Sequence, residues 1–315
     1  MNLSVMPDFP ASWLPSLPLP LARAVLHPMF RYSMNSRLPW ALQRKLLDSG
    51  AVLQAVPAGT RVHRMRLAGR PAERVSAGTA AGPGAVLYLH GGGYTIGSPA
   101  THRSLAGWLA RETGCPIYVP DYRLAPEHPY PAALDDAEAA FLELVSTGLL
   151  PREIAVAGDS AGGGLALALA LRLRDRHGIV PAALGLIAPW ADPNELAERD
   201  RDLVINAAWS RSCAAAYLGG ADPLDVGYAP LLGDLRGLPT TYIQADSGEL
   251  LHAQCVRLAA ALRTAEVPVH FSVTDGLWHV AQAQASLVRP AGAAARELGR
   301  FLGESLQPAQ TGSIG

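Results

Sequence analysis

The chain has 315 residues, of which 17% are charged, and its formal net charge is −1. This length allows a sizeable core, in one large domain or in one with a smaller appendage. The near-neutral balance leaves no electrostatic footprint for nucleic acid or anionic lipid, so we expect neither partner and favour a small neutral or apolar one.

The cysteines and the apolar segments bear on metal binding and on the compartment. Cys115, Cys213 and Cys255 are widely spaced and form no CxxC pair, which indicates neither a disulfide framework nor a zinc site. The N-terminal segment has no basic residue before Arg23 and is interrupted by prolines, unlike a secretory signal. The uncharged apolar tract that ends at Arg172 is shorter than the roughly 20 residues that cross a bilayer. We therefore expect a soluble cytoplasmic protein.

In chain order, residues 1 to about 55 are predicted to be helical and without strands, and candidate strands then alternate with helical stretches. The later candidates are short apolar runs, which are typical of strands covered on both faces. This order predicts a mostly parallel eight-stranded α/β sheet flanked by helices. The predicted strands are 61–67, 73–77, 85–90, 116–120, 154–158, 183–189, 240–245 and 267–273.

Two segments stand outside this alternation and predict a cap. Residues 190–236 form an insertion between two strands, at the carboxyl edge where open α/β sheets bind ligands. We expect a helical cap built from 1–55 and 190–236. The core would then comprise 56–189 and 237–305. The tail, 306–315, is predicted to be disordered.

The stretch 154–173 predicts a strand, a sharp turn and a buried helix, because alanine and leucine dominate after the glycines and β-branched residues are scarce. Ser160 lies there in GDSAG at 158–162, which fits GxSxG. Between a strand and a helix this motif forms a nucleophile elbow, whereas elsewhere it would be only a tight turn. The GDSGG of trypsin-like proteases is a superficial likeness, since those proteases are all-β and have the order His, Asp, Ser.

A serine hydroxyl needs a general base, and in this type of fold the acid and the histidine follow the serine. Four histidines follow Ser160. His177 ends the buried helix on the far side of the sheet, His252 is expected on a helix, and His270 lies inside the last strand. His279 falls in a loop after that strand, so we predict His279 as the base.

The acid is expected in the loop after the seventh strand, which offers Asp246 and Glu249. Its task is to accept a hydrogen bond from the imidazole, fix its tautomer and stabilise the imidazolium. Asp246 is of the usual type, but it directly follows the strand and could instead cap the next helix. The spacing alone leaves both residues open.

An oxyanion needs backbone N–H donors that face empty space, and HGGGY at 90–94 follows the third strand as a second donor loop would. It would complement the N–H of Ala161, next to the nucleophile. The alternative, a phosphate loop, is disfavoured because neither a GK[ST] ending nor a GxGxxG spacing is present.

Four motifs taken together resemble the hormone-sensitive lipase family of bacterial esterases, in the α/β-hydrolase superfamily. They are HGGGY at 90–94, DYRLAPEHPYPAALDD at 121–136, GDSAGG at 158–163 and DGLWH at 275–279. The likeness covers about residues 60–305 and implies an α/β-hydrolase fold. No chemical role follows for the second motif, which we interpret as a scaffold for the HGGG loop.

Residue by residue, the resemblance implies Ser160 as nucleophile and His279 as base. It implies oxyanion donors at Gly92, Gly93 and Ala161. The family's acid motif, DPLRDE, is not intact, but ELLHAQ at 249–254 places Glu249 where the family's aspartate stands. Glu249 also precedes His279 by about the family's distance. The resemblance therefore favours Glu249 over Asp246.

The resemblance and the residues together indicate a carboxylesterase that uses an acyl-enzyme and needs no metal or organic cofactor. A capped pocket with apolar residues suggests a small-molecule ester with a short to medium acyl chain; the residues expected near it are Trp13, Leu14, Leu17 and Trp209. Lactonase, amidase and deacetylase activities would use the same machinery. A non-catalytic small-molecule receptor is disfavoured, because related receptors have lost the histidine that DGLWH keeps. Members of the family often pair through the last strand, so a homodimer is a further expectation.

Overall fold

The computed structural model describes residues 16–51, 54–78, 82, 84–195 and 199–307. Most of the predicted disordered tail, from residue 308 on, therefore lies outside the described residues, and so do Trp13 and Leu14. Leu306, the first residue of the predicted tail, is buried against the core. The predicted tail therefore begins too early in the sequence.

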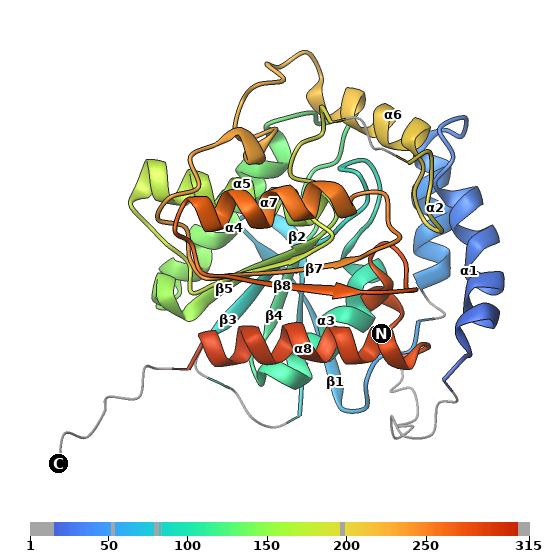
Figure 1. Ribbon diagram of the computed structural model, residues 1–315. Coiled ribbons are helices and arrows are strands. Elements are labelled where there is room, and N and C mark those ends of the chain that lie inside the picture. Colours follow the sequence, from blue (N-terminus) through green and yellow to red (C-terminus); the bar gives the residue numbers. More distant parts are fainter. Residues whose placement is uncertain (1–15, 52–53, 79–81, 83, 196–198, 308–315) are drawn as a thin grey trace.

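Eight strands form one sheet in the order β1-β2-β4-β3-β5-β6-β7-β8 (Figure 1). β1 pairs antiparallel with β2, β2 pairs antiparallel with β4, and every other neighbouring pair is parallel. All eight predicted strands are present, so the mostly parallel α/β sheet is confirmed. Their bounds are β1 Thr60–Leu67, β2 Arg70–Ala77, β3 Ala85–Leu89, β4 Ile117–Pro120, β5 Ile154–Asp159, β6 Leu184–Ile187, β7 Thr241–Asp246 and β8 Val269–Thr274.

Helices cover both faces of the sheet. Figure 1 shows α3 (Pro99–Thr113) and α8 (Arg289–Ser305) on one face, and α4 (Ala132–Ser146), α5 (Ala161–His177) and α7 (His252–Thr264) on the other. Each face has its own apolar cluster, which explains why the central strands β3, β5, β6 and β7 are buried along their whole length. β8 lies at one edge of the sheet, and the homodimer expected through it stays a prediction.

Three helices lie apart from these two layers, on the side to which β8 points in Figure 1. They are α1 (Leu19–Ser33), α2 (Trp40–Ala51) and α6 (Ala207–Leu218). The indole Nε1 of Trp209 on α6 donates to Gln43 Oε1 on α2 at 2.8 Å, and the Asn206 amide donates to the carbonyl of Met34 at 3.2 Å. These bonds tie the inserted segment to the N-terminal helices, as a cap made of both would require, although the division into domains stays a prediction.

The described part of the chain also includes the short 3₁₀ turns η1 (Pro151–Glu153), η2 (Pro230–Leu232) and η3 (Ala281–Gln284). None of the described helices has an apolar segment long enough to cross a membrane. Cys115, Cys213 and Cys255 are buried, and each has a free thiol.

Helix α5 begins against the backbone of the neighbouring strand. A Cβ atom on Gly162, in its first turn, would overlap the carbonyl oxygen of Leu89 at the end of β3. The next two turns are alanine and leucine, which are strong helix formers, and they are buried on every side. Glycine therefore permits a helix-to-strand distance that alanine would not.

We expect Gly162→Ala to lower the free energy of unfolding by about 2 kcal/mol or more, because the added methyl group overlaps a backbone oxygen that cannot turn away. The matched control is Gly50→Ala in α2, where the new Cβ meets only the flexible Met29 sulfur at 3.4 Å. There alanine should be neutral or stabilising by up to about 1 kcal/mol. Urea unfolding measures both, and equal effects would contradict the steric account.

Candidate active site

Ser160 occupies the sharp turn between β5 and α5. Its backbone has φ 52° and ψ −122°, a left-handed conformation that costs energy for a residue other than glycine. The turn is held because Ser160 N–H donates to the Ile187 carbonyl and Trp190 N–H donates to the Ser160 carbonyl, both at 2.8 Å. A Cβ on Gly158 would overlap the carbonyl of Gly162, so both glycines of the motif are steric requirements.

His279 contacts two of the residues singled out in the sequence. Its Nε2 lies 2.9 Å from Ser160 Oγ, and its Nδ1 lies 3.2 Å from Glu249 Oε2. His279 and Glu249 are buried, at 3% and 2% exposed. The three side chains come from the carboxyl ends of β5, β7 and β8, and they form one continuous chain of polar contacts.

The other three histidines that follow Ser160 lie away from this chain. His177 ends α5 and contacts Glu138 at 2.7 Å, and His252 begins α7. His270 lies in β8, where its ring stacks on Tyr242. Their positions are those expected from the sequence, and only His279 reaches the serine.

Asp246 supports the loop that leads to His279. Its Oδ2 accepts hydrogen bonds from the backbone N–H of Leu277 at 2.8 Å and from the Thr274 hydroxyl at 2.9 Å, and its Oδ1 accepts from Gly248 N–H at 3.0 Å. It does not cap α7, which starts at His252 without a side-chain cap. Glu249, and not Asp246, therefore faces the imidazole.

Of the proposed oxyanion donors, Gly92 lines the same cavity as Ser160, and Ala161 follows the serine directly. Gly92 and Gly93 have φ of +118° and +60°, and a Cβ on Gly92 would overlap the carbonyl of Ile96. Their N–H groups have no hydrogen-bond acceptor among the described residues. Ala161 is the first residue of α5, and the first N–H groups of a helix have no partner inside it. Their role as donors stays a prediction.

The 121–136 motif supports the HGGG loop, as the sequence analysis expected. The Tyr122 hydroxyl donates to the His90 carbonyl at 2.6 Å, and the two rings stack with centroids 4.2 Å apart. Ala125 N–H donates to the carbonyl of Tyr94 at 2.9 Å. The loop is thus clamped at both of its ends.

Comparisons with known proteins identify the family of this chain. Residues 86–283 match a protein family described as alpha/beta hydrolase fold. The chain is 38% identical over 292 residues to LipR of Mycobacterium tuberculosis, covering 91% of this chain and 95% of LipR. An esterase crystal structure from the bacterial hormone-sensitive lipase family matches with a TM-score of 0.86 and 34% identity, covering 90% of this chain and 98% of that one. The chain belongs to the hormone-sensitive lipase family.

A further relative of this esterase is an acetyl-hydrolase of Streptomyces hygroscopicus. It is 40% identical over 200 residues, which are 62% of this chain and 67% of the relative. The resemblance stated from the motifs, the α/β-hydrolase fold and the enzyme class, a carboxylic ester hydrolase, are confirmed.

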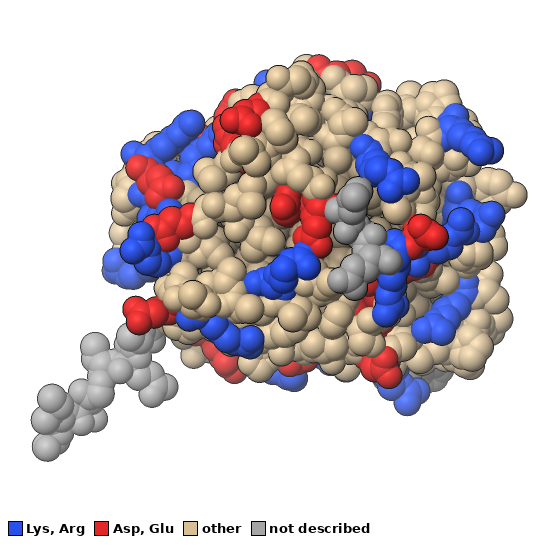
Figure 2. Space-filling view, turned by 45° about the horizontal axis from the view of Figure 1, so that its top comes forward, with Lys and Arg blue, Asp and Glu red and all other residues tan. Residues whose placement is uncertain are grey.

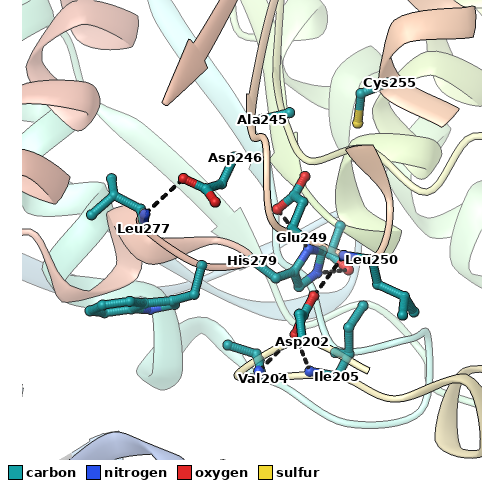
Figure 3. A network of polar contacts seen from close by, with 12 residues as sticks. Asp202, Val204, Ile205, Ala245, Asp246, Glu249, Leu250, Cys255, Leu277 and His279 are labelled. Atoms are coloured by element: carbon teal, nitrogen blue, oxygen red, sulfur yellow. Dashed lines mark hydrogen bonds and ion pairs between the residues drawn. The ribbon is translucent and has the colours of Figure 1, made fainter. Parts of the chain in front are cut away.

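Asp202 is a residue of the site that sequence reasoning missed. Its Oδ1 accepts from the backbone N–H groups of Val204 and Ile205 at 2.7 and 2.8 Å, and its Oδ2 accepts from Leu250 N–H at 2.9 Å (Figure 3). It joins the inserted segment to the loop that carries Glu249. No motif marks it, because two of the bonds form an ordinary local turn with Val204 and Ile205, and the bond that ties it to the site comes from Leu250, 48 residues away.

A cavity opens onto Ser160 and His279 in this esterase. Its walls are largely apolar. The segment after β8 contributes Val280 and Ala283, and the N-terminal region and the inserted segment contribute Met29, Phe30, Met34, Leu47, Val204, Ile205 and Trp209. Trp209 was expected there. Leu17 does not line the cavity, because its backbone binds Leu287 instead.

Burial and charge act in opposite directions on the pKa of His279. Burial lowers it, but the hydrogen bond to Glu249 and the charge of that carboxylate raise it, with a smaller contribution from Asp202, and the pKa lies above the ordinary value. The pKa of Glu249 is itself raised by burial, although the contact with His279 opposes this. The pair therefore favours a histidine that accepts a proton readily.

We expect the imidazole of His279 to titrate above the ordinary value of about 6.5 in an NMR titration. Glu249→Gln should lower its pKa, because burial remains while the neighbouring charge is lost. Asp246→Asn, the matched control, should change it less, because Asp246 bonds to the 274–277 turn instead of the ring. His90, whose pKa burial lowers to about 3, gives an internal signal that stays neutral. If Asp246→Asn shifted the pKa of His279 more than Glu249→Gln does, Asp246 would be the acid of the triad.

Proposed function

We propose that this esterase hydrolyses short to medium acyl esters with Ser160, His279 and Glu249 as a catalytic triad. One observation carries the proposal: a single buried imidazole lies within hydrogen-bonding distance of both the elbow serine and the Glu249 carboxylate. A nucleophile, a base and a group that orients the base are the parts that acyl transfer through a covalent intermediate requires.

In the first half of the reaction, His279 Nε2 takes the proton of Ser160 Oγ as the oxygen attacks the acyl carbonyl carbon. Electrons move to the carbonyl oxygen, and the N–H groups of Gly92, Gly93 and Ala161 would stabilise the resulting oxyanion. Each such donor contributes roughly 3 kcal/mol to the transition state. The intermediate collapses, the alcohol oxygen takes the proton from His279 and leaves, and the acyl group stays on Ser160.

In the second half, His279 removes a proton from water, which attacks the acyl-enzyme. The new tetrahedral intermediate collapses as its bond to Ser160 Oγ breaks, His279 returns the proton to that oxygen, and the carboxylic acid is released. Throughout, Glu249 accepts the Nδ1–H hydrogen bond, which keeps Nε2 free to act as base and stabilises the imidazolium. The raised pKa of His279 suits this task.

The walls of the cavity support an apolar acyl or alcohol group of limited length. Among the alternatives, removal of acetyl groups is favoured by one observation, the similarity to an acetyl-hydrolase. A small uncharged ester also agrees with the surface in Figure 2, where basic and acidic side chains are interspersed with uncharged residues. A non-catalytic receptor is disfavoured because His279 contacts Ser160 directly.

Ser160→Ala should lower kcat on p-nitrophenyl butyrate by at least about a thousandfold, since no other group can form the acyl-enzyme. The matched control is Ser146→Ala at the exposed end of α4, which should hydrolyse the ester at the wild-type rate. Ester hydrolysis that survives Ser160→Ala unchanged would rule out the proposed mechanism.

Across p-nitrophenyl esters with two to sixteen acyl carbons, we expect the highest kcat/KM at short chains, near two to about eight carbons, and little activity at sixteen. Leu47→Ala should move the optimum to longer chains by about two carbons, because it removes volume from the cavity wall. Leu46→Ala is the control, since its side chain is adjacent in sequence, exposed, and not in the wall. If the two variants show the same dependence of kcat/KM on chain length, the acyl chain does not bind against this cavity wall.

A further inference from the structure

A buried ion pair lies beside the nucleophile and takes no part in the triad. His102 Nε2, on α3, is 3.2 Å from Oδ1 of Asp159, the residue before Ser160. The two residues are 7% and 3% exposed. Both line the cavity that holds Ser160 and His279. The charges of this pair therefore lie close to the atoms of an ester that reacts with Ser160.

The Asp159 carboxylate joins the nucleophile elbow to the HGGG loop. Its Oδ1 accepts hydrogen bonds from the backbone N–H of Gly91 at 3.0 Å and from the Tyr88 hydroxyl at 2.7 Å. A Cβ on Gly91 would overlap the other carboxylate oxygen, so the loop rests directly on Asp159. Because Gly91 precedes Gly92, the carboxylate sets where the proposed donor lies relative to Ser160.

Both ring nitrogens of His102 face acceptors. Nε2 faces the carboxylate, and Nδ1 lies 2.8 Å from Thr101 Oγ1 and 3.3 Å from the Ser98 carbonyl. The Thr101 hydroxyl donates to that same carbonyl at 2.7 Å, so toward His102 its oxygen is an acceptor. An acceptor at each nitrogen favours the doubly protonated ring, the imidazolium.

The surroundings agree with a charged His102. Burial lowers its pKa, but the charge and hydrogen bond of Asp159 outweigh burial and raise it. Burial likewise favours neutral Asp159, yet His102 keeps its pKa below the ordinary value. The neighbouring His90 ring, 5.5 Å away between centroids, has its pKa lowered to about 3 by burial and by His102, so His90 is neutral.

We propose that Asp159 and His102 are positioning residues for ester hydrolysis, an inference that rests on the proposed function. Asp159 fixes the Gly91 amide and with it the donor loop, and the His102 cation cancels the carboxylate's charge. A carboxylate without its cation, next to Ser160 in a buried site, would oppose the negative charge that forms on the substrate oxygen. The pair thus holds the donor loop in place without adding a net negative charge that would disfavour the oxyanion.

The test compares His102→Gln, Asp159→Asn and the double variant by kcat and KM on p-nitrophenyl butyrate, with circular dichroism to check folding. His102→Gln leaves the carboxylate uncompensated, so kcat should fall by about 30-fold while KM stays within about twofold. Asn in place of Asp159 removes that charge, and its amide oxygen can still accept from Gly91 N–H. The double variant should therefore recover about tenfold of the kcat lost in His102→Gln.

His177→Gln is the matched control, because that histidine is also paired with a carboxylate, Glu138, but lies at the far end of α5. Its kcat should equal that of the wild type. A trifluoromethyl ketone, whose enzyme-bound hemiketal oxygen would occupy the donors, gives a second readout. Its inhibition constant should rise in His102→Gln by the same factor as kcat falls.

The proposal is overturned if His102→Gln keeps kcat within twofold of the wild type, or if the double variant is no faster than His102→Gln. Should His102→Gln fail to fold, Asp159→Ala is compared with Asp159→Asn. Alanine cannot accept from Gly91 N–H, so it should be at least about tenfold slower, and equal rates would overturn the proposal. If Ser160→Ala is inactive and His102→Gln is unimpaired, the proposed triad mechanism stands and only the positioning role fails. If Ser160→Ala keeps its activity, both the triad mechanism and the positioning role fail.

Discussion

The site depends on how closely helix α5 approaches the strands beneath it. Gly158 and Gly162 let the backbone of the turn touch its neighbours, and the left-handed conformation of Ser160 between them follows from that contact. The same approach places the first turn of α5 against the end of β3, where the HGGG loop begins. One packing constraint thus sets both the serine and the loop around it.

Parallel strands explain why distant segments can complete this site. The carboxyl ends of β5, β7 and β8 lie along one edge of the sheet, and the loops that leave them carry Ser160, Glu249 and His279. Asp246 and Asp202 then bind backbone N–H groups of these loops and fix their course. The contacts of His279 therefore depend on carboxylates that do not themselves touch the serine.

Much of this was predictable from the sequence, and the reasons are physical. The buried strands are short apolar runs bounded by turn residues, so all eight could be found, and GDSAG between a strand and a helix identified Ser160. The position of His279 after the last strand followed from the strand order. The choice of Glu249 over Asp246 needed a resemblance, because both carboxylates lie in the same loop and only their direction separates them.

Other parts of the site depend on tertiary contacts that leave no periodic signal. Asp202 accepts a hydrogen bond from the backbone N–H of Leu250, 48 residues away, and His102 meets Asp159 across 57 residues of chain. Neither has a motif that reasoning from spacing could use. The cavity wall was likewise only partly predictable: Trp209 lies in it, whereas Leu17 is directed elsewhere by its bond to Leu287.

The hydrogen bonds that join α2 to α6 and α1 to the inserted segment have a consequence for how this enzyme can diversify. The cavity wall comes largely from the beginning of the chain and from one insertion, while the proposed catalytic groups lie at the carboxyl edge of the sheet. Substitutions in the first fifty residues can therefore reshape selectivity while the reactive centre is left intact. Exchange of that region between relatives is a natural way to redirect the chemistry to new esters.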